Sequence, residues 1–208
     1  ASGTVSAINR GDKRVLQSVV IDVEGDEAAQ FESYDVASAN ALDADTVRAQ
    51  LVKSGQWTAL RTRPFSRVPA PASEADAIFV TAIDTHPLAA DPAIIIAEQK
   101  EAFGLGLNLL AKLTAGKLYL CAAAGADLPE GQASNIEVAR FSGPHPAGLA
   151  GTHIHFLEGV SVNKTVWTIS YQDVIAVGQL FLLGRLYTQR AISLGGPQVD
   201  SPVLLRTR

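Results

Sequence analysis

Hydrophobic and polar residues alternate through the first 24 residues, ASGTVSAINRGDKRVLQSVVIDVE, on both sides of a turn at Gly11 and Asp12. Alternation with a period of two is typical of a half-buried strand, and a Gly-Asp pair between two such runs favours a tight hairpin. The pattern therefore predicts a β-hairpin or the edge of a small barrel. We interpret residues 1–30 as a small all-β segment.

Helical patterns follow at three places. The stretch DADTVRAQLVKSG offers an N-cap at Asp43 or Asp45 and a glycine stop at Gly55. The stretch DPAIIIAEQKEAFGLGLNLLAKLT predicts one long helix, because an aspartate can cap it, a proline fits its first turn and apolar residues recur at helical spacing. A mostly apolar helix is expected over residues 172–186.

Nearly continuous apolar runs indicate strands that are buried on both faces of a parallel sheet. These runs are ADAIFVTAID, KLYLCAAA and NIEVARFSG, and further strands are expected at TVWTIS, 190–194 and 203–206. Strands that alternate with helices predict right-handed crossovers and an α/β fold. We therefore predict a Rossmann-like three-layer domain over residues 31–195, preceded by the small all-β segment, with residues 196–208 starting a further domain.

Composition narrows the class of protein. The chain has 208 residues, 47% of them hydrophobic and 18% charged, and a formal net charge of -4. This balance supports a real core and gives no electrostatic reason to expect nucleic acid as a partner. The longest apolar run, VIAVGQLFLLG, is far shorter than the roughly 20 residues that cross a bilayer. The absence of methionine and of a signal peptide indicates an internal piece of a longer protein.

Common catalytic and cofactor motifs are missing. The sequence has no G-x-G-x-x-G turn, no P-loop lysine motif and no G-x-S-x-G elbow. Its single cysteine, Cys121, excludes an internal disulfide and a cysteine-rich zinc or iron–sulfur site. We interpret Cys121, within an apolar run, as a buried small hydrophobe rather than a reactive thiol.

The histidines are weak metal candidates. His86 stands alone, whereas His145, His153 and His155 lie in GPHPAGLAGTHIHFLEG, where glycines and prolines indicate a tight irregular loop. An H-x-H pair on a strand would place both rings on one face, as some metal sites require. Only Glu158 is an adjacent carboxylate, so local hydrogen bonds or an interface are the favoured roles, and no metal is expected.

Several stretches together resemble one family, the A subunits of the Na+-translocating NADH:quinone reductases. They are ASGTVSAINRGDKRVLQSVVID, LVKSGQWTALRTRPFSRVPA, AIFVTAIDTHPLAA, FSGPHPAGLAGTHIHFLEGV and TISYQDVIAVGQLFLLGRLYTQRAISLGGPQV. They cover nearly the whole chain in order. The resemblance implies that residues 1–30 are the C-terminal part of a biotinyl/lipoyl-like domain, and that the following domain resembles the flavin- and NADH-binding subunit of complex I.

In those flavin-binding relatives, a glycine-rich loop wraps the flavin phosphate. Here Ser54, Gly55 and Phe65 match that loop, whereas positions that want glycine hold larger residues, among them Thr58, Leu60, Arg61, Thr62 and Arg63. A Cβ at such a position prevents close approach of a phosphate or a flavin ring. We therefore expect the cofactor pocket to be filled, and the chain to bind neither flavin nor NADH.

Two further elements of the ancestral site also depart from the relatives. An acidic loop is replaced by TAIDTHPLAAD, and a Y-P-x-G-x-E element is replaced by HPAGLAG, which lacks the glutamate. The degenerate former cofactor site comprises Ser54, Gly55, Thr58, Asp84, Thr85, His86, His145 and Gly148.

The resemblance implies a peripheral subunit on the cytoplasmic face of the bacterial inner membrane, which contributes to ubiquinone reduction together with an integral membrane subunit. FAD, FMN, riboflavin and iron–sulfur cofactors are expected in other subunits. In the loop GQWTALRTRPFSRVPA, Trp57 and Phe65 offer flat surfaces for a quinone, and Arg61, Arg63 and Arg67 offer hydrogen-bond donors. Alternatively, Trp57 and Phe65 pack into the vacated pocket, the three arginines pair with acidic side chains or dock a partner subunit, and the chain is a non-catalytic scaffold.

Overall fold

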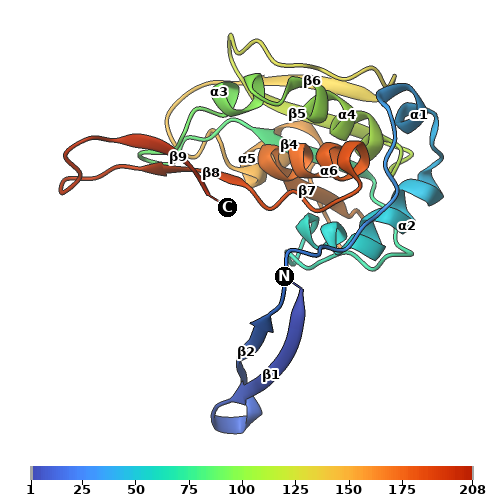
Figure 1. The fold of residues 1–208 in the computed structure, drawn as a ribbon. Coiled ribbons are helices and arrows are strands. Elements are labelled where there is room, and N and C mark those ends of the chain that lie inside the picture. The colour runs from blue at the N-terminus through green and yellow to red at the C-terminus, as the bar shows by residue number, and fades with distance from the viewer. Residues whose placement is uncertain (1, 208) are drawn as a thin grey trace. The chain divides into compact units, whose positions relative to one another are not determined.

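A computed structural model describes residues 2–207, and the chain divides into two compact units, Ala1–Gln30 and Phe31–Arg208 (Figure 1). In the first unit, β1 (Gly3–Arg10) pairs with the antiparallel β2 (Leu16–Val23) through a 3-10 turn, η1 (Asp12–Arg14). The predicted hairpin is therefore present. None of its described residues is buried, and a lone two-stranded hairpin has little stability of its own in water.

The second unit is built on a five-stranded sheet in the order β3-β7-β4-β5-β6. Its strands are β3 (Arg61–Arg63), β4 (Ala77–Ala82), β5 (Lys117–Ala123), β6 (Ile136–Phe141) and β7 (Val166–Ser170). Strands β7, β4, β5 and β6 are parallel, and β3 is an antiparallel edge strand. The three predicted apolar runs and TVWTIS thus form the parallel strands, as expected for an α/β fold.

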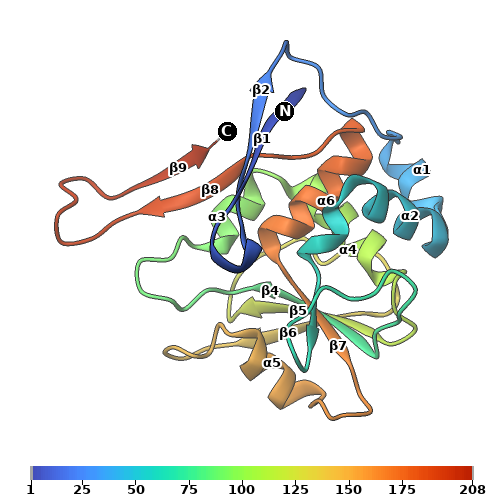
Figure 2. The same ribbon diagram turned by 90° about the horizontal axis from the view of Figure 1, so that it is seen from below.

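Helices cover both faces of the sheet (Figure 2). One face carries α1 (Val36–Ala41), α2 (Ala44–Ser54), α3 (Pro92–Ala97), α4 (Lys100–Ala111) and α6 (Tyr171–Leu183). The other face carries α5 (Ala150–Leu157). Strand β4 shows the cause: Ile78 and Val80 point into the larger core, and Ala77 and Phe79 point into the smaller core under α5. The apolar run of β4 is continuous because both of its faces are buried.

Helix boundaries follow local signals. Asp43 caps α2 by accepting a hydrogen bond from the Thr46 amide, and Gly55 ends α2 in the left-handed conformation with φ +81°. Asp91 caps α3 in the same way, with Pro92 in its first turn. These termini were predicted from the sequence.

The predicted long helix over 91–114 is wrong, because the chain forms two helices. Gln99 separates α3 from α4 with φ -133° and ψ 34°, and its side chain accepts a hydrogen bond from Gln179 of α6 at 2.6 Å. The residue at the break is thus held by a neighbouring helix. No proline or glycine at this position marks the break in the sequence.

The stretch that follows α6 forms a second hairpin, β8 (Arg190–Leu194) with β9 (Val203–Thr207), which extends away from the sheet (Figure 1). Both strands lie where the sequence predicted them. Within residues 2–207, no helix is long and apolar enough to span a membrane.

Candidate functional site

A cavity of about 520 Å³ lies at the carboxyl ends of β4 and β7. From β4 the chain passes to β5 and β6 on one side, and it then returns to β7 on the other side of β4. This point is where an open α/β sheet usually forms its ligand crevice. The cavity is lined by Gly55, Gln56, Thr58, Ala59, Arg61, Thr81, Ala150, Thr168, Ile169, Ser170, Asp173 and Arg190.

The loop after α2 forms one wall of this cavity. Gly55 reverses the chain with positive φ, and the 3-10 helix η2 (Gln56–Ala59) then leads into β3. The expected irregular loop is therefore a short helix followed by an edge strand. Thr58 and Arg61 are exposed on the wall of the cavity. The expectation that side chains fill this place is wrong, because the bulky tryptophan of the loop turns into the core instead.

That tryptophan, Trp57, is only 3% exposed. Its Nε1 donates a hydrogen bond to the carbonyl oxygen of Pro69 at 2.8 Å, and its ring meets Trp167 of β7 edge to face. The guanidinium of Arg48 lies 5.2 Å from the ring centroid. Trp57 is therefore a core residue and presents no flat surface to a ligand, contrary to the role suggested for it from the sequence.

Arginines set the charge of the cavity. Arg61 donates through Nη1 to the carbonyl oxygens of Leu60, at 2.8 Å, and Thr58. Arg190 forms an ion pair with Asp173 in the first turn of α6. Among residues 2–207, no carboxylate forms an ion pair with Arg61. The two guanidinium groups and one carboxylate leave an excess of one positive charge.

Five of the residues that the sequence assigned to a degenerate cofactor site gather near the same end of β4. Asp84 Oδ1 accepts a hydrogen bond from His86 Nδ1 at 2.7 Å. The Thr85 hydroxyl lies 3.2 Å from His145 Nδ1 and accepts a hydrogen bond from the Gly148 amide at 2.9 Å. The two imidazole rings lie 4.8 Å apart between centroids. The structure thus brings residues 84–86 and 145–148 together, whereas Ser54 belongs to the end of α2.

The other two histidines lie on helix α5, where the sequence indicated an irregular loop, so they do not have the strand geometry that would place both rings on one face. Positions two residues apart on a helix face roughly 200° apart. His153 of α5 is fully buried and donates from Nε2 to the carbonyl oxygen of Ala147 at 2.8 Å, whereas His155 is exposed. Burial lowers the pKa of His153. Within residues 2–207, no group of three or more His, Cys, Asp or Glu side chains is placed to hold a metal ion.

A second cavity, of about 460 Å³, lies between β3 and α5. Its lining residues are Arg63, Pro64, Phe65, Gly151, Ile154, His155, Gly159 and Val160. The Nε atom of Arg63 is buried and has no hydrogen-bond partner among the described residues. Arg63 also lines the cavity, and a buried donor without a partner costs free energy.

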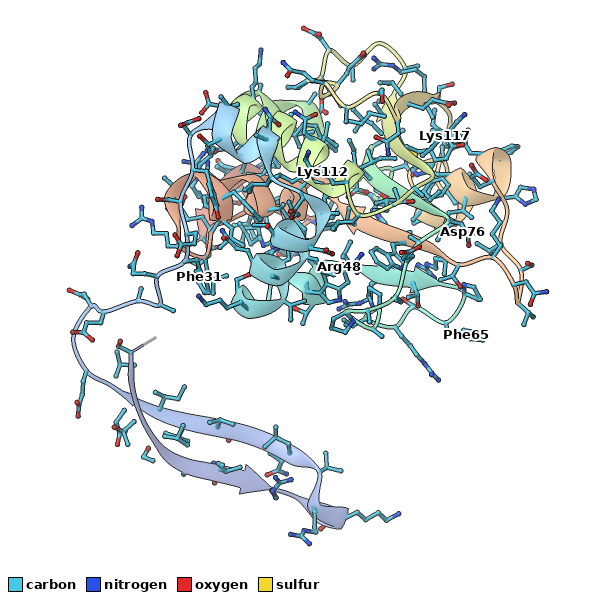
Figure 3. The ribbon with its side chains drawn as sticks, turned by 90° about the vertical axis from the view of Figure 1, so that its right-hand side faces the viewer. Phe31, Arg48, Phe65, Asp76, Lys112 and Lys117 are labelled. Carbon is cyan, nitrogen blue, oxygen red and sulfur yellow. The ribbon has the colours of Figure 1, made fainter. Side chains whose placement is uncertain are left out.

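A tight turn presents the Phe65 ring at the rim of this second cavity. Phe65 and Ser66 both adopt positive φ, and the Thr62 amide donates to the carbonyl oxygen of Arg67 at 2.7 Å to close the turn. Phe65 is consequently 78% exposed and lies at the surface of the second unit (Figure 3). The Arg67 guanidinium lies 5.9 Å from the Phe65 ring centroid. A bulky residue in this conformation is uncommon and indicates a constrained loop.

The register of the sheet explains why the two cavities are neighbours. Arg61 pairs with Thr168 and Arg63 with Val166, so both arginines point to the face of the sheet that α5 covers. The five loop residues singled out from the sequence are therefore divided between the core, the first cavity and the second cavity. Thr81, Ser170, Asp173 and Arg190 were not anticipated as site residues, although Ser170 and Asp173 show the spacing of a helix cap.

The fold defines an α/β domain with a crevice at the carboxyl ends of two parallel strands, and comparison with known proteins gives its family. Residues 42–186 match the family model described as the NqrA second alpha/beta domain. The chain belongs to this family. It is 60% identical over 208 residues to the A subunit of the Na(+)-translocating NADH-quinone reductase of Saccharophagus degradans, and 59% identical over 208 residues to that of Cellvibrio japonicus. The corresponding protein of Neisseria gonorrhoeae is 59% identical over 207 residues.

These comparisons cover all of this chain and 46% of each of the three relatives. The chain thus spans about half the length of the curated relatives it matches. The resemblance on which the sequence interpretation rests is confirmed.

Proposed function

We propose that this chain is part of a peripheral subunit of a Na+-translocating NADH:ubiquinone oxidoreductase and that it contributes to ubiquinone reduction and complex assembly. Family membership supports a role within this complex. The proposed place of action is the cytoplasmic face of the bacterial inner membrane, beside an integral membrane subunit.

The second cavity is the proposed quinone site, and the buried Nε of Arg63 is the observation that carries this assignment. A quinone combines a flat apolar ring with carbonyl oxygens that accept hydrogen bonds. Pro64, Phe65 and Ile154 supply apolar walls, and Arg63 supplies a donor without a partner among the described residues. Arg67, stacked near Phe65, adds positive charge that would stabilise a reduced, anionic quinone.

Titration with a short-chain soluble ubiquinone tests the assignment. We expect saturable quenching of tryptophan fluorescence and at least about tenfold weaker binding for Arg63→Ala, because a hydrogen bond to a charged donor is worth about 1.5–3 kcal/mol. Arg140→Ala, on β6 at the opposite edge of the sheet, is the control. Equal affinities of the two variants, or no saturable response, would contradict the assignment.

We also propose that the chain holds no flavin, NADH or iron–sulfur centre, so that FAD, FMN, riboflavin and iron–sulfur groups belong to other subunits. The single cysteine is buried in β5 and cannot supply the ligand set of an iron–sulfur centre, and the sequence has no G-x-G-x-x-G turn for a dinucleotide. We further propose that the sheet derives from a Rossmann-like domain. A flavin spectrum that persists in the purified chain would overturn it.

Docking without quinone contact is the second candidate function, and exposed apolar side chains favour it. Phe65 is 78% exposed, Phe156 of α5 is 72% exposed, and Val162 is 91% exposed. Aromatic residues at such positions are frequent in interfaces. Under this alternative, Phe65→Ala and Phe156→Ala would weaken assembly with the membrane subunits and leave ubiquinone affinity unchanged.

A further inference from the structure

We propose that the first cavity, beside Arg61, is an oxyanion site that takes a phosphate or a phosphoryl group. This site is distinct from the proposed quinone site, since the two cavities share no lining residue. Three features carry the proposal: the place of the cavity in the sheet, its excess positive charge, and a guanidinium group that the protein holds in place.

The cavity occupies the topological switch point. Thr81 and Ser170 form the last register pair of β4 and β7, and both line the cavity. The strand order reverses between these two strands, because the chain runs from β4 outward to β5 and β6 and then returns to β7 on the other side of β4. Crevices of this kind bind ligands in open α/β sheets, and about 520 Å³ is within the usual range of ligand pockets.

Arg61 supplies the charge that is not neutralised. Arg190 and Asp173 neutralise each other, whereas Arg61 forms no ion pair with a carboxylate of residues 2–207. A guanidinium is a planar fork of donors that matches the oxygens of a phosphate. The charge excess favours an anion, and the shape of the donor favours an oxyanion.

Backbone carbonyl groups hold Arg61 in place. Its Nη1 donates to the carbonyl oxygens of Leu60 and Thr58, which fixes the plane of the guanidinium and leaves its other nitrogens for a ligand. Less conformational entropy is then lost on binding.

The opposite wall of the cavity can accept an anion because the charge of its one carboxylate is neutralised. Asp173 would repel a phosphate, but Arg190 pairs with it and the Ser170 hydroxyl donates to its Oδ2 at 2.8 Å. The positive end of the α6 dipole lies on this wall and adds a modest attraction. We therefore expect anion binding to require the Arg190–Asp173 ion pair, because the pair neutralises the carboxylate that would otherwise repel the ligand.

The test is a titration of the ¹⁵N-labelled chain with inorganic phosphate at constant ionic strength, with chloride as the reference anion. Amide shifts of Gly55, Thr58 and Ser170 report on the cavity. We expect saturable shifts, and Arg61→Gln should weaken binding about tenfold or more, the value of a charge-assisted hydrogen bond. Arg140→Gln, on β6 at the opposite edge of the sheet and outside both cavities, is the control and should change affinity less than about twofold.

A parallel titration with a nucleoside monophosphate separates two sources of the phosphoryl group. Tighter binding than that of inorganic phosphate, with the same loss in Arg61→Gln, would identify a larger phosphorylated ligand. If inorganic phosphate binds and the nucleoside monophosphate does not, the ligand of the cavity is free phosphate. Shifts that chloride reproduces, equal effects of the Arg61 and Arg140 variants, or no binding of either compound would overturn the proposal. None of these outcomes depends on ubiquinone binding.

Discussion

The indole rings of Trp57 and Trp167 meet edge to face, with centroids 5.4 Å apart and an interplanar angle of 81°. Edge-to-face geometry is favourable between aromatic rings, and here it joins the loop after α2 to strand β7 across the larger core. The contact positions η2, and η2 in turn positions Thr58 and the backbone that leads to Arg61. The wall of the first cavity therefore depends on a tryptophan that does not line it.

The first prediction concerns this anchor. Trp57→Ala should lower the free energy of unfolding by about 3–5 kcal/mol, because it empties a buried aromatic site. Trp57→Phe should cost about 1–3 kcal/mol, because it leaves the carbonyl oxygen of Pro69 without its donor. Urea denaturation measures both values.

The control for the Trp57 variants lies in the same loop. Phe65→Ala removes an aromatic ring that is 78% exposed and should change stability by less than about 0.5 kcal/mol. If Trp57→Ala were as mild as Phe65→Ala, the ring would not be the anchor described above.

The second prediction concerns the close approach of α4 and α6. A Cβ at Gly178 would lie 1.9 Å from the carbonyl oxygen of Ala102, and a Cβ at Gly106 would lie 2.2 Å from that of Val174. Both obstacles are backbone atoms, so the helices would have to move apart. Gly178→Ala should therefore destabilise the protein by about 1–3 kcal/mol in a denaturation experiment.

Gly104 provides a matched control on α4. The nearest atom to a Cβ at that position is Pro129 Cβ at 3.8 Å, an ordinary contact. Gly104→Ala should stabilise the protein by about 0.5–1 kcal/mol, since alanine is the better helix former. A destabilisation as large as that of Gly178→Ala would show that any side chain disturbs α4.

The sequence predicted those elements whose signals are local. The aspartate and glycine at the ends of α2, and the apolar runs of β4 and β5, set their positions by capping and burial. The break at Gln99 was missed because its partner, Gln179, is 80 residues away in the chain. Helix α5 was missed because its flanking glycines and prolines indicated a loop, while Ile154 packs under the sheet and fixes the helix.

The candidate site could be predicted only in part, because some of its residues are brought together by contacts between distant parts of the chain. Gly55, Thr58 and Arg61 lie in one conspicuous loop and were singled out as site residues. Arg190 reaches the cavity from β8, and no pattern near it indicates this role. The loop itself was expected to fill the crevice, and the local sequence could not show that Trp57 would turn towards Trp167 instead.

The third prediction is a pH dependence from His153. Burial holds the pKa of His153 below its usual value of about 6.5, despite the hydrogen bond to the carbonyl oxygen of Ala147, which acts in the opposite direction. Above pH 6.5 the imidazole is neutral in both states and this contribution to stability is complete. As the pH falls below about 6.5, the unfolded chain binds a proton that the folded chain does not, so stability falls until the folded pKa is passed.

Denaturation between pH 7.5 and pH 4.5 measures this slope for the wild type and for His153→Gln. Glutamine keeps an N–H donor and does not titrate, so the variant should lose stability less steeply below about pH 6.5. His155→Gln is the control for removing an imidazole from the same helix, since His155 is exposed. A His153→Gln variant with the wild-type slope would show that another group causes the pH dependence.

The fourth prediction concerns Cys121, which lies in β5 with no exposed surface. Burial raises the pKa of its thiol to about 12, so the reactive thiolate is scarce at neutral pH. A disulfide reagent should therefore modify the folded chain about a thousandfold more slowly than the chain in denaturant. Release of the coloured thiolate at pH 7.5, with and without urea, measures the ratio. Equal rates would mean that β5 opens readily and that Cys121 is not the inert core residue its environment indicates.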